Sequence, residues 1–254
     1  MLILLLLVGA LTLHGLVSPS INTLASHSTG TRSARRVSIA TAPVRRRLGL
    51  GRSVLGHRIE AVELGQPSST RKLLVVGCIH GDEAAGIAIA RRLERRAPPA
   101  GADLWVLEDL NPDGVAAHTR QNAHGVDLNR NFPWGWRRIG RRGDQQYSGA
   151  HPLSEPEARI AHALIMRVRP AITIWFHQPL ALVDESGGRI DIERRFARLS
   201  GLPLRRLTRY PGSAVGWQDH RLPNTTSFVV ELPAGPLGAS RLARYSHAVT
   251  ELAR

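Results

Sequence analysis

The stretch VVGCIHGDEAAG (Val75–Gly86) joins an apolar run to small helix-forming residues, with a histidine and two acids at the junction. Such an apolar run is typical of a buried strand, and AAGIAIARRLERR (Ala84–Arg96) has the apolar spacing of a helix. The junction has two interpretations. Asp82 is a candidate N-cap, with Glu83 in the first turn. Alternatively, His80 and Glu83 form half of a metal site.

The rest of the chain repeats this alternation of strands and helices. Strands are predicted at His57–Leu64, Lys72–Ile79, Asp103–Leu110, Ala171–Phe176 and Ser227–Leu232. Helices are predicted at Ala84–Arg96, Ser154–Val168 and Leu237–Ala253, the second opened by a capping box of Ser154 and Glu157. The pattern predicts a single α/β domain whose mixed, mostly parallel central β-sheet is flanked by helices on both faces.

Three polar residues stand where the predicted strands end. His80 follows one buried strand, His177 follows another in TIWFHQP, and Glu231 interrupts a third in VVELP. Each has an ordinary explanation, as a hydrogen-bonded core histidine or a solvated glutamate. Functional sites in such sheets gather at strand ends, however, and two histidines with a glutamate are a common ligand set for catalytic zinc. With Glu83 included, one glutamate is left as a candidate general base.

Composition narrows the classes of partner. The 254 residues include 34 basic and 20 acidic side chains, for a formal net charge of +14. The basic residues are almost all arginines and are scattered, without the aromatic-interleaved stripe expected of a nucleic-acid interface. We therefore predict no nucleic-acid binding, whereas association with an anionic cell wall suits the charge. The single cysteine, Cys78, excludes an internal disulfide and a cysteine-based zinc site.

The N-terminal segment is typical of an export signal. LILLLLVGALTLHGLV (Leu2–Val17) is apolar and uncharged, and TLA ending at Ala25 resembles a cleavage site. We predict a signal peptide or N-terminal anchor at residues 1–25, a basic Ser/Thr/Arg-rich linker at 26–47, and a folded domain at 48–254. The expected location is the periplasm, the cell wall or the medium, with membrane anchoring if the segment is retained.

A second motif lies in NPDGVAAHTRQNAHGVDLNRNFP (Asn111–Pro133). By itself this segment is a loop with turn residues at both ends. Together with HGDE, it resembles the zinc metallocarboxypeptidase family, the carboxypeptidase A-like enzymes. The family pattern is H-x-x-E, then N-P-D-G, an arginine, an N-R pair, a distant histidine and a glutamate on a late strand. All of these elements occur here in order, from roughly Arg52 to Leu232. The resemblance implies that residues 48–254 form a zinc peptidase/amidase domain.

The resemblance implies a role for each matching residue. One Zn²⁺ per chain would be held by His80, Glu83 and His177, and Asp127 would orient the first histidine. Glu231 would be the general base that takes a proton from the attacking water.

The resemblance also implies how the substrate is held. Arg120 would stabilise the developing oxyanion. Asn129 and Arg130 would bind the free carboxylate of the released residue, and Tyr210 would match a mobile tyrosine that closes over it. The partner would then be a peptide or muropeptide with a free C-terminal carboxylate.

Finer details favour the bacterial murein peptide amidase A group, which GVDLNRNFP, HQPL and SFVVELPAG resemble. This implies release of meso-diaminopimelate from γ-D-glutamyl-diaminopimelate in peptidoglycan peptides. The alternatives are a general metallocarboxypeptidase, a small-molecule deacylase of the succinylglutamate desuccinylase or aspartoacylase type, and a cell-wall-binding pseudo-peptidase.

The pocket for the released side chain is expected near Ala214, Val215 and Gly216. For a zwitterionic side chain, the candidate acceptors are Gln218 and Asp219 and the candidate donors are His220 and Arg221. All four are equally compatible with an ordinary surface loop.

Overall fold

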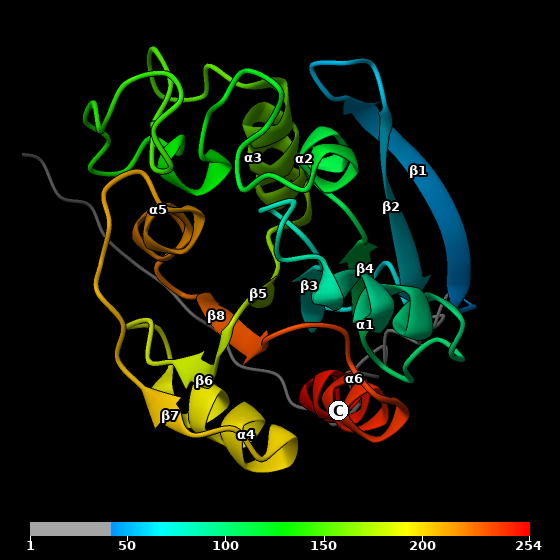
Figure 1. Ribbon diagram of the computed structural model, residues 1–254. Helices are drawn as coiled ribbons and strands as arrows, with labels where there is room; N and C mark the ends of the chain where they lie inside the picture. The colour runs from blue at the N-terminus through cyan, green and yellow to red at the C-terminus, as the bar shows by residue number, and fades with distance from the viewer. Residues whose placement is uncertain (1–41) are drawn as a thin grey trace, which may run out of the picture. The chain divides into compact units, whose positions relative to one another are not determined.

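The structure is a computed structural model that describes residues 42–254 (Figure 1). The predicted signal peptide or anchor and most of the predicted linker lie outside these residues. The first strand, β1 (Val44–Arg52), pairs antiparallel with β2 (Arg58–Gly65). Strand β1 therefore starts before Leu48, where the folded domain was predicted to begin. The sequence did not indicate this strand because its arginine side chains are largely exposed.

The central sheet has eight strands in the order β1-β2-β4-β3-β5-β8-β6-β7 within the described residues. Its other strands are β3 (Lys72–Val76), β4 (Asp103–Leu107), β5 (Ile172–His177), β6 (Leu180–Asp184), β7 (Leu204–Arg205) and β8 (Thr226–Pro233). The middle strands β4, β3, β5 and β8 are mutually parallel. Antiparallel pairs attach β2 to β4 and β6 to β8. The prediction of a mixed, mostly parallel sheet is confirmed.

Helices cover both faces of this sheet (Figure 1). One face packs against α1 (Ala85–Glu94), α4 (Ile190–Ser200) and α6 (Ala239–Leu252). The other packs against α3 (Pro156–Val168) and α5 (Ala214–Arg221), and a short helix α2 (Pro112–Ala117) follows β4. Within residues 42–254, no helix has both the length and the apolar character needed to cross a membrane.

The two helical layers explain why the central strands are apolar throughout. In β3, Leu73 and Val75 enter the core on the α1 side, whereas Leu74 and Val76 enter the core on the α3 side. Successive side chains of a strand point to opposite faces, so a strand covered on both faces needs apolar residues at every position. Each such side chain contributes about 1.5–3 kcal/mol when it is fully buried.

Two predicted helix caps are wrong. Helix α1 begins after Ala84, and no side chain caps it, so Asp82 is not its N-cap. Helix α3 begins at Pro156 after Glu155, and the hydroxyl of Ser154 donates to the Glu155 carboxylate at 2.7 Å. The Glu157 carboxylate instead accepts from the Val54 amide at 3.0 Å. The acids around these helix ends are used in tertiary contacts, which local spacing does not reveal.

Glu193 of α4 makes stability depend on pH. Its side chain is fully buried, and one oxygen accepts from the Ser186 amide at 3.0 Å. The other oxygen has no partner among the described residues. Burial, reinforced by the nearby Asp184 carboxylate, raises the pKa of Glu193 to about 7. The folded protein therefore holds a proton that the unfolded chain releases near its ordinary pKa of 4.5.

The raised pKa of Glu193 predicts the direction in which folding stability changes with pH. Glu193 makes its full contribution to the free energy of unfolding below about pH 4.5. As the pH rises towards 7, this contribution is lost, and the free energy of unfolding falls by about 1–3 kcal/mol. Urea unfolding at pH 5 and pH 8 measures the loss in the wild type and in Glu193→Gln, which cannot ionise. The variant should show a smaller difference between the two pH values; an unchanged difference would assign the pH dependence to other groups.

Candidate active site

The carboxyl ends of three neighbouring parallel strands bring the candidate residues together. His80 lies in the loop after β3, His177 is the last residue of β5, and Glu231 lies near the end of β8. Strand β5 pairs with both β3 and β8, and His177 lies directly opposite Glu231 in the register. Residues distant in the sequence therefore meet at one edge of the sheet, where α/β proteins place their sites.

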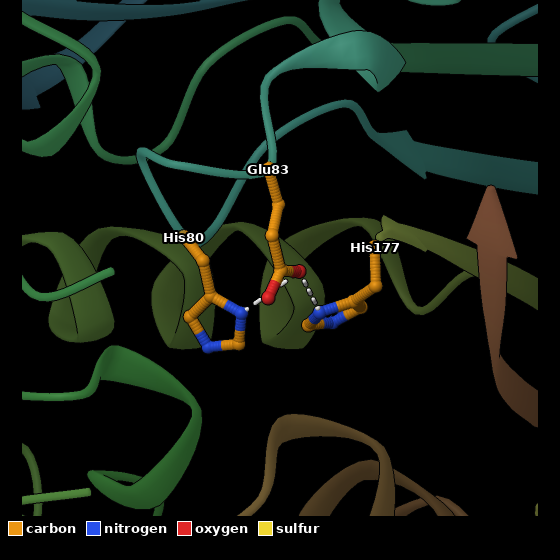
Figure 2. Close-up of side chains that lie close together, drawn as sticks. All are labelled: His80, Glu83 and His177. Atoms are coloured by element: carbon orange, nitrogen blue, oxygen red, sulfur yellow. Dashed lines mark hydrogen bonds and ion pairs between the residues drawn. The ribbon is translucent and has the colours of Figure 1, made fainter. Parts of the chain in front are cut away.

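His80, Glu83 and His177 form a compact cluster at this edge (Figure 2). One carboxylate oxygen of Glu83 lies 3.1 Å from Nδ1 of His80 and 2.8 Å from Nδ1 of His177. The two imidazole rings have centroids 4.7 Å apart. Figure 2 shows the carboxylate between the two rings, and the three potential ligand atoms all lie within 4.8 Å of one another.

The donor set of this cluster fits a zinc ion. His80 Nδ1 and His177 Nε2 are buried and make no hydrogen bond within the described part of the chain. Burial opposes ionisation of Glu83, but the two imidazoles outweigh it and hold the pKa of that carboxyl well below its usual range. Two imidazoles with nitrogen lone pairs to share and one ionised carboxylate are the protein ligands of many catalytic zinc sites.

Asp127 fixes the orientation of His80. Its carboxylate lies 3.0 Å from Nε2 of His80 and accepts from Nε of Arg120, also at 3.0 Å. It also accepts from the Asn129 amide at 2.9 Å, as the cap of a single turn of 3₁₀ helix, Leu128–Arg130. Burial is outweighed by His80 and Arg120, so the pKa of Asp127 is lowered. An ionised Asp127 stabilises the tautomer with the proton on Nε2, which leaves Nδ1 for a metal.

The glycines of the HGDE and NPDG motifs bring the loop after β3 into direct contact with the start of helix α2, in a segment that the sequence alone predicted to be a loop. A Cβ at Gly81 would fall 1.9 Å from the carbonyl carbon of Gly114. A Cβ at Gly114 would fall 2.5 Å from the side-chain nitrogen of Asn111, which itself donates to the Ile79 carbonyl at 3.1 Å. Only glycine allows the backbones to approach so closely. The NPDG motif, at the start of helix α2, therefore supports the loop that carries His80 and Glu83.

Arg120 lies beside the cluster in a fixed orientation. Its Nη1 donates to the second oxygen of Glu83 at 2.8 Å, and its Nε contacts Asp127. The guanidinium also lines the adjacent cavity, where a developing negative charge would meet it. Arg120 thus lies beside the cluster and at the cavity, and its role as an oxyanion stabiliser stays a prediction.

A cavity of about 410 Å³ opens in front of the cluster. It is lined by Glu83, His177 and Glu231 and also by the predicted substrate-binding residues Asn129, Arg130 and Tyr210. The volume suits a small ligand or the end of a peptide. One cavity is therefore lined by two of the three candidate metal ligands, by the candidate base and by the arginine expected to hold a carboxylate.

Glu231 faces this cavity because of strand alternation. Its neighbours Val230 and Leu232 enter the core on the α1 side, so Glu231 points to the opposite face. The apolar pattern of β8 is thus not broken inside the core. Burial raises the pKa of Glu231, and the nearby Glu83 adds to the effect although His177 opposes it. A raised pKa brings the carboxylate closer to the range useful for a general base.

Comparison with known proteins identifies the family to which this chain belongs. The sequence profile described as "Zinc carboxypeptidase" matches residues 99–180. Murein peptide amidase A of Escherichia coli K12 is 32% identical over 181 residues, covering 66% of this chain and 74% of that protein. The Vibrio campbellii protein of the same name is 34% identical over 197 residues, covering 72% and 77%. This chain belongs to the zinc carboxypeptidase family.

Solved structures agree with this assignment. The murein-tripeptide amidase of Escherichia coli O157 superimposes with a TM-score of 0.65 at 30% identity, covering 82% of this chain and 91% of that one. Carboxypeptidase A of Helicoverpa armigera gives a TM-score of 0.72 at 17% identity, covering 83% and 68%, which shows a shared fold. The protein is therefore a hydrolase of a zinc-dependent family, and the predicted fold and family are confirmed.

In this zinc carboxypeptidase, Arg130 and Tyr210 lie together at the cavity. The guanidinium of Arg130 stacks over the Tyr210 ring at 4.1 Å from its centroid and donates to the Asn129 carbonyl at 2.8 Å. Arg130 is buried, and its Nε has no partner among the residues described. The Asn129 side-chain oxygen accepts from the Ala214 amide at 2.9 Å, which fixes that residue against α5. Tyr210 is partly exposed, in the segment between β7 and α5.

Only some of the residues expected to determine specificity line the main cavity. Val215 and Gly216 line it, whereas the buried Ala214 does not. Gln218 is buried, donates to Thr173 at 2.9 Å and lines neither the main cavity nor the adjoining one. Asp219 and His220 line an adjoining cavity, and Arg221 lines neither of these two cavities.

Sequence reasoning missed two charged residues that line the main cavity, Asp184 and Arg209. Asp184 ends β6, a strand that the sequence did not predict, and Arg209 is one arginine in an arginine-rich segment. The position of Asp184 after the HQPL motif was a usable signal, because it is polar at a strand end. Nothing in the sequence distinguishes Arg209 from its neighbours.

Proposed function

We propose that this zinc carboxypeptidase releases meso-diaminopimelate from peptidoglycan peptides by cleaving its amide bond to γ-D-glutamate. The observation that carries the proposal is that Glu83 and His177 of the His80–Glu83–His177 cluster line the same cavity as Glu231 and Arg130. Relatives named murein peptide amidase A, at 32% and 34% identity, support the choice of substrate. A basic protein also suits an anionic wall fragment.

In this proposal one Zn²⁺ per chain is held by His80, Glu83 and His177. When bound, such an ion polarises the substrate carbonyl and makes a nearby water more acidic. Asp127 keeps His80 in the orientation and tautomer that binding requires, through its 3.0 Å contact.

The side chains at the cavity supply the proton transfers and the charge stabilisation. Glu231 accepts a proton from a water as that water attacks the amide carbon. The carbonyl oxygen becomes negatively charged and is stabilised by the Arg120 guanidinium, which Asp127 and Glu83 already orient. Glu231 then delivers the proton to the leaving nitrogen as the C–N bond breaks, so the released residue leaves as an amine and the acyl side as a carboxylic acid.

The released residue is held by its own carboxylate. Arg130 presents a planar fork that can make two hydrogen bonds to that carboxylate, and Asn129 lies beside it. Tyr210 stacks against Arg130 and covers this end of the cavity. Recognition of a terminal carboxylate would restrict cleavage to the C-terminal end of an accessible peptide.

This recognition predicts a strong preference for a free terminal carboxylate. The test pair is a tripeptide ending in free diaminopimelate and the same tripeptide amidated at the α-carboxylate. Amidation removes a charge-assisted contact and leaves Arg130 partly unpaired, so kcat/KM should fall by about 2–4 kcal/mol in activation free energy. Mass spectrometry of the products measures both rates and identifies the bond that is cut.

Arg130→Ala should remove most of the difference between the two tripeptides. Equal cleavage of both by the wild type would contradict the carboxylate-binding role and favour a deacylase that recognises only the acyl side. Cleavage of ordinary peptides at least as fast as muropeptides would favour a general metallocarboxypeptidase. A wall-binding pseudo-peptidase would cleave neither; the presence of all three possible ligands and the possible base argues against it. Export from the cytoplasm stays a prediction.

A further inference from the structure

The main cavity has a charged group that amide hydrolysis does not use. Besides the residues assigned above, two further segments line it. One is the end of β6 and the residues just after it, with Asp184 and Ser186, and the other precedes α5, with Leu207, Thr208 and Arg209. Hydrolysis and binding of the terminal carboxylate need none of these residues. Arg209 also lines the adjoining cavity, together with Ser186 and Tyr210, and so lies where the two cavities meet.

The guanidinium of Arg209 is held in place from one side. Its Nη1 donates to the Asp184 carboxylate at 2.5 Å, and its Nη2 donates to the carbonyl of Glu185. The side chain nevertheless remains 41% exposed. Arg209 is thus a cation in a fixed orientation, and its side chain is accessible from the cavity.

Asp184 serves to hold this arginine. It is only 3% exposed, and its second oxygen accepts from the Leu207 amide at 2.9 Å. The hydroxyl of Ser186 donates to the oxygen that also binds Arg209, at 3.2 Å. With donors on both oxygens, Asp184 is a positioning residue for Arg209 and for the segment that precedes α5.

We propose that Arg209 binds a carboxylate at the end of the released residue's side chain and thereby determines specificity. The other two cavity arginines have assigned partners: Arg120 pairs with Glu83 and Asp127, and Arg130 faces the terminal carboxylate. A guanidinium fork matches a carboxylate with two parallel hydrogen bonds. The inference rests on the proposed function for the identity of the residue, because the diaminopimelate side chain ends in an ammonium and a carboxylate.

Lysine provides the discriminating comparison, because it is diaminopimelate without the distal carboxylate. Two γ-D-glutamyl tripeptides, one ending in meso-diaminopimelate and one in lysine, are assayed with the zinc-loaded enzyme. The wild type should prefer the diaminopimelate peptide by about 10–100-fold in kcat/KM, the range expected for a charge-assisted contact. Arg209→Ala should bring the ratio close to one by slowing only the diaminopimelate peptide, mainly through KM.

Two further variants separate recognition from folding. Arg189→Ala removes an arginine that makes an exposed ion pair, 2.7 Å from Asp191, and that lines neither cavity. This variant should leave the ratio unchanged. Asp184→Asn keeps an acceptor for the Leu207 amide but removes the charge that orients Arg209, so the ratio should fall partway. An equal loss of activity on both peptides in Arg209→Ala would show a purely structural role and overturn the proposal.

A binding measurement decides the inference independently of turnover. Isothermal calorimetry with free meso-diaminopimelate and free lysine should show about 10–100-fold tighter binding of the former to the wild type. That difference should disappear in Arg209→Ala. If the wild type cleaves neither tripeptide but the calorimetric difference is present, the proposed reaction fails while this subsite stands. Equal binding of the two amino acids overturns the subsite whatever the enzyme cleaves.

Discussion

Glu231→Gln is expected to lower kcat by about 10²–10⁴-fold while zinc content and substrate KM stay near their wild-type values. Glutamine has nearly the same shape and keeps an oxygen at this position, but it cannot accept the proton of the attacking water. Glu231 lies opposite His177 in the sheet and lines the cavity without belonging to the His–Glu–His cluster. Its loss should therefore affect the proton transfer and leave metal binding intact.

The measurement is steady-state hydrolysis of the diaminopimelate tripeptide, with metal content determined on the same samples. Glu251→Gln is the matched control, because it removes a carboxylate from α6, away from the cavity. Its kcat should equal that of the wild type. Near-normal turnover in zinc-replete Glu231→Gln would show that another residue activates the water, and the proton-transfer scheme above would have to be abandoned.

His177→Ala is expected to abolish both zinc binding and activity. Nδ1 of His177 lies 2.8 Å from Glu83, and its Nε2 makes no hydrogen bond within residues 42–254. Three protein ligands are the usual minimum for a catalytic zinc, so the loss of one imidazole leaves an inadequate site. Elemental analysis after zinc reconstitution should find about one ion per chain in the wild type and almost none in the variant.

His247→Ala is the control for this experiment, because His247 is a largely exposed residue of α6 outside the cluster. It should keep its zinc. Circular dichroism should show the same fold for both variants, since His177 is at the end of a strand that is otherwise anchored in the core. If the wild type stays metal-free after reconstitution, or if His177→Ala retains zinc, the assignment of the cluster as the metal site is wrong.

The central strands and the cluster could be predicted because their sequence signals are local. In β3 and β5, nearly every position is apolar since both faces are buried, and this pattern is visible without any tertiary information. His80 and His177 stand out because each is polar immediately after such a run. Sites in α/β sheets gather at strand ends, so these residues were expected to share a site. The structure shows that the strands carrying them are neighbours, because β5 pairs with both β3 and β8.

Other features could not be predicted because long-range contacts decide them. Strand β1 is mostly exposed and is stabilised by its pairing with β2. The acids of HGDE and the Ser154 segment have the spacing of helix caps, yet Glu83 faces two imidazoles and Glu157 accepts from the Val54 amide. Capping and metal binding require the same residue types, so local sequence does not separate them.

The sequence by itself therefore determined the α/β class and the polar residues at the ends of the central strands, because burial periodicity is written residue by residue. The resemblance to the zinc carboxypeptidase family then assigned the candidate ligands and base. Only the tertiary structure decided what surrounds them. Asp184 and Arg209 reach the cavity because β6 returns antiparallel along β8 and the segment before α5 folds back onto it. The ion pair between Asp184 and Arg209 joins residues 25 positions apart, and local sequence periodicity does not predict it.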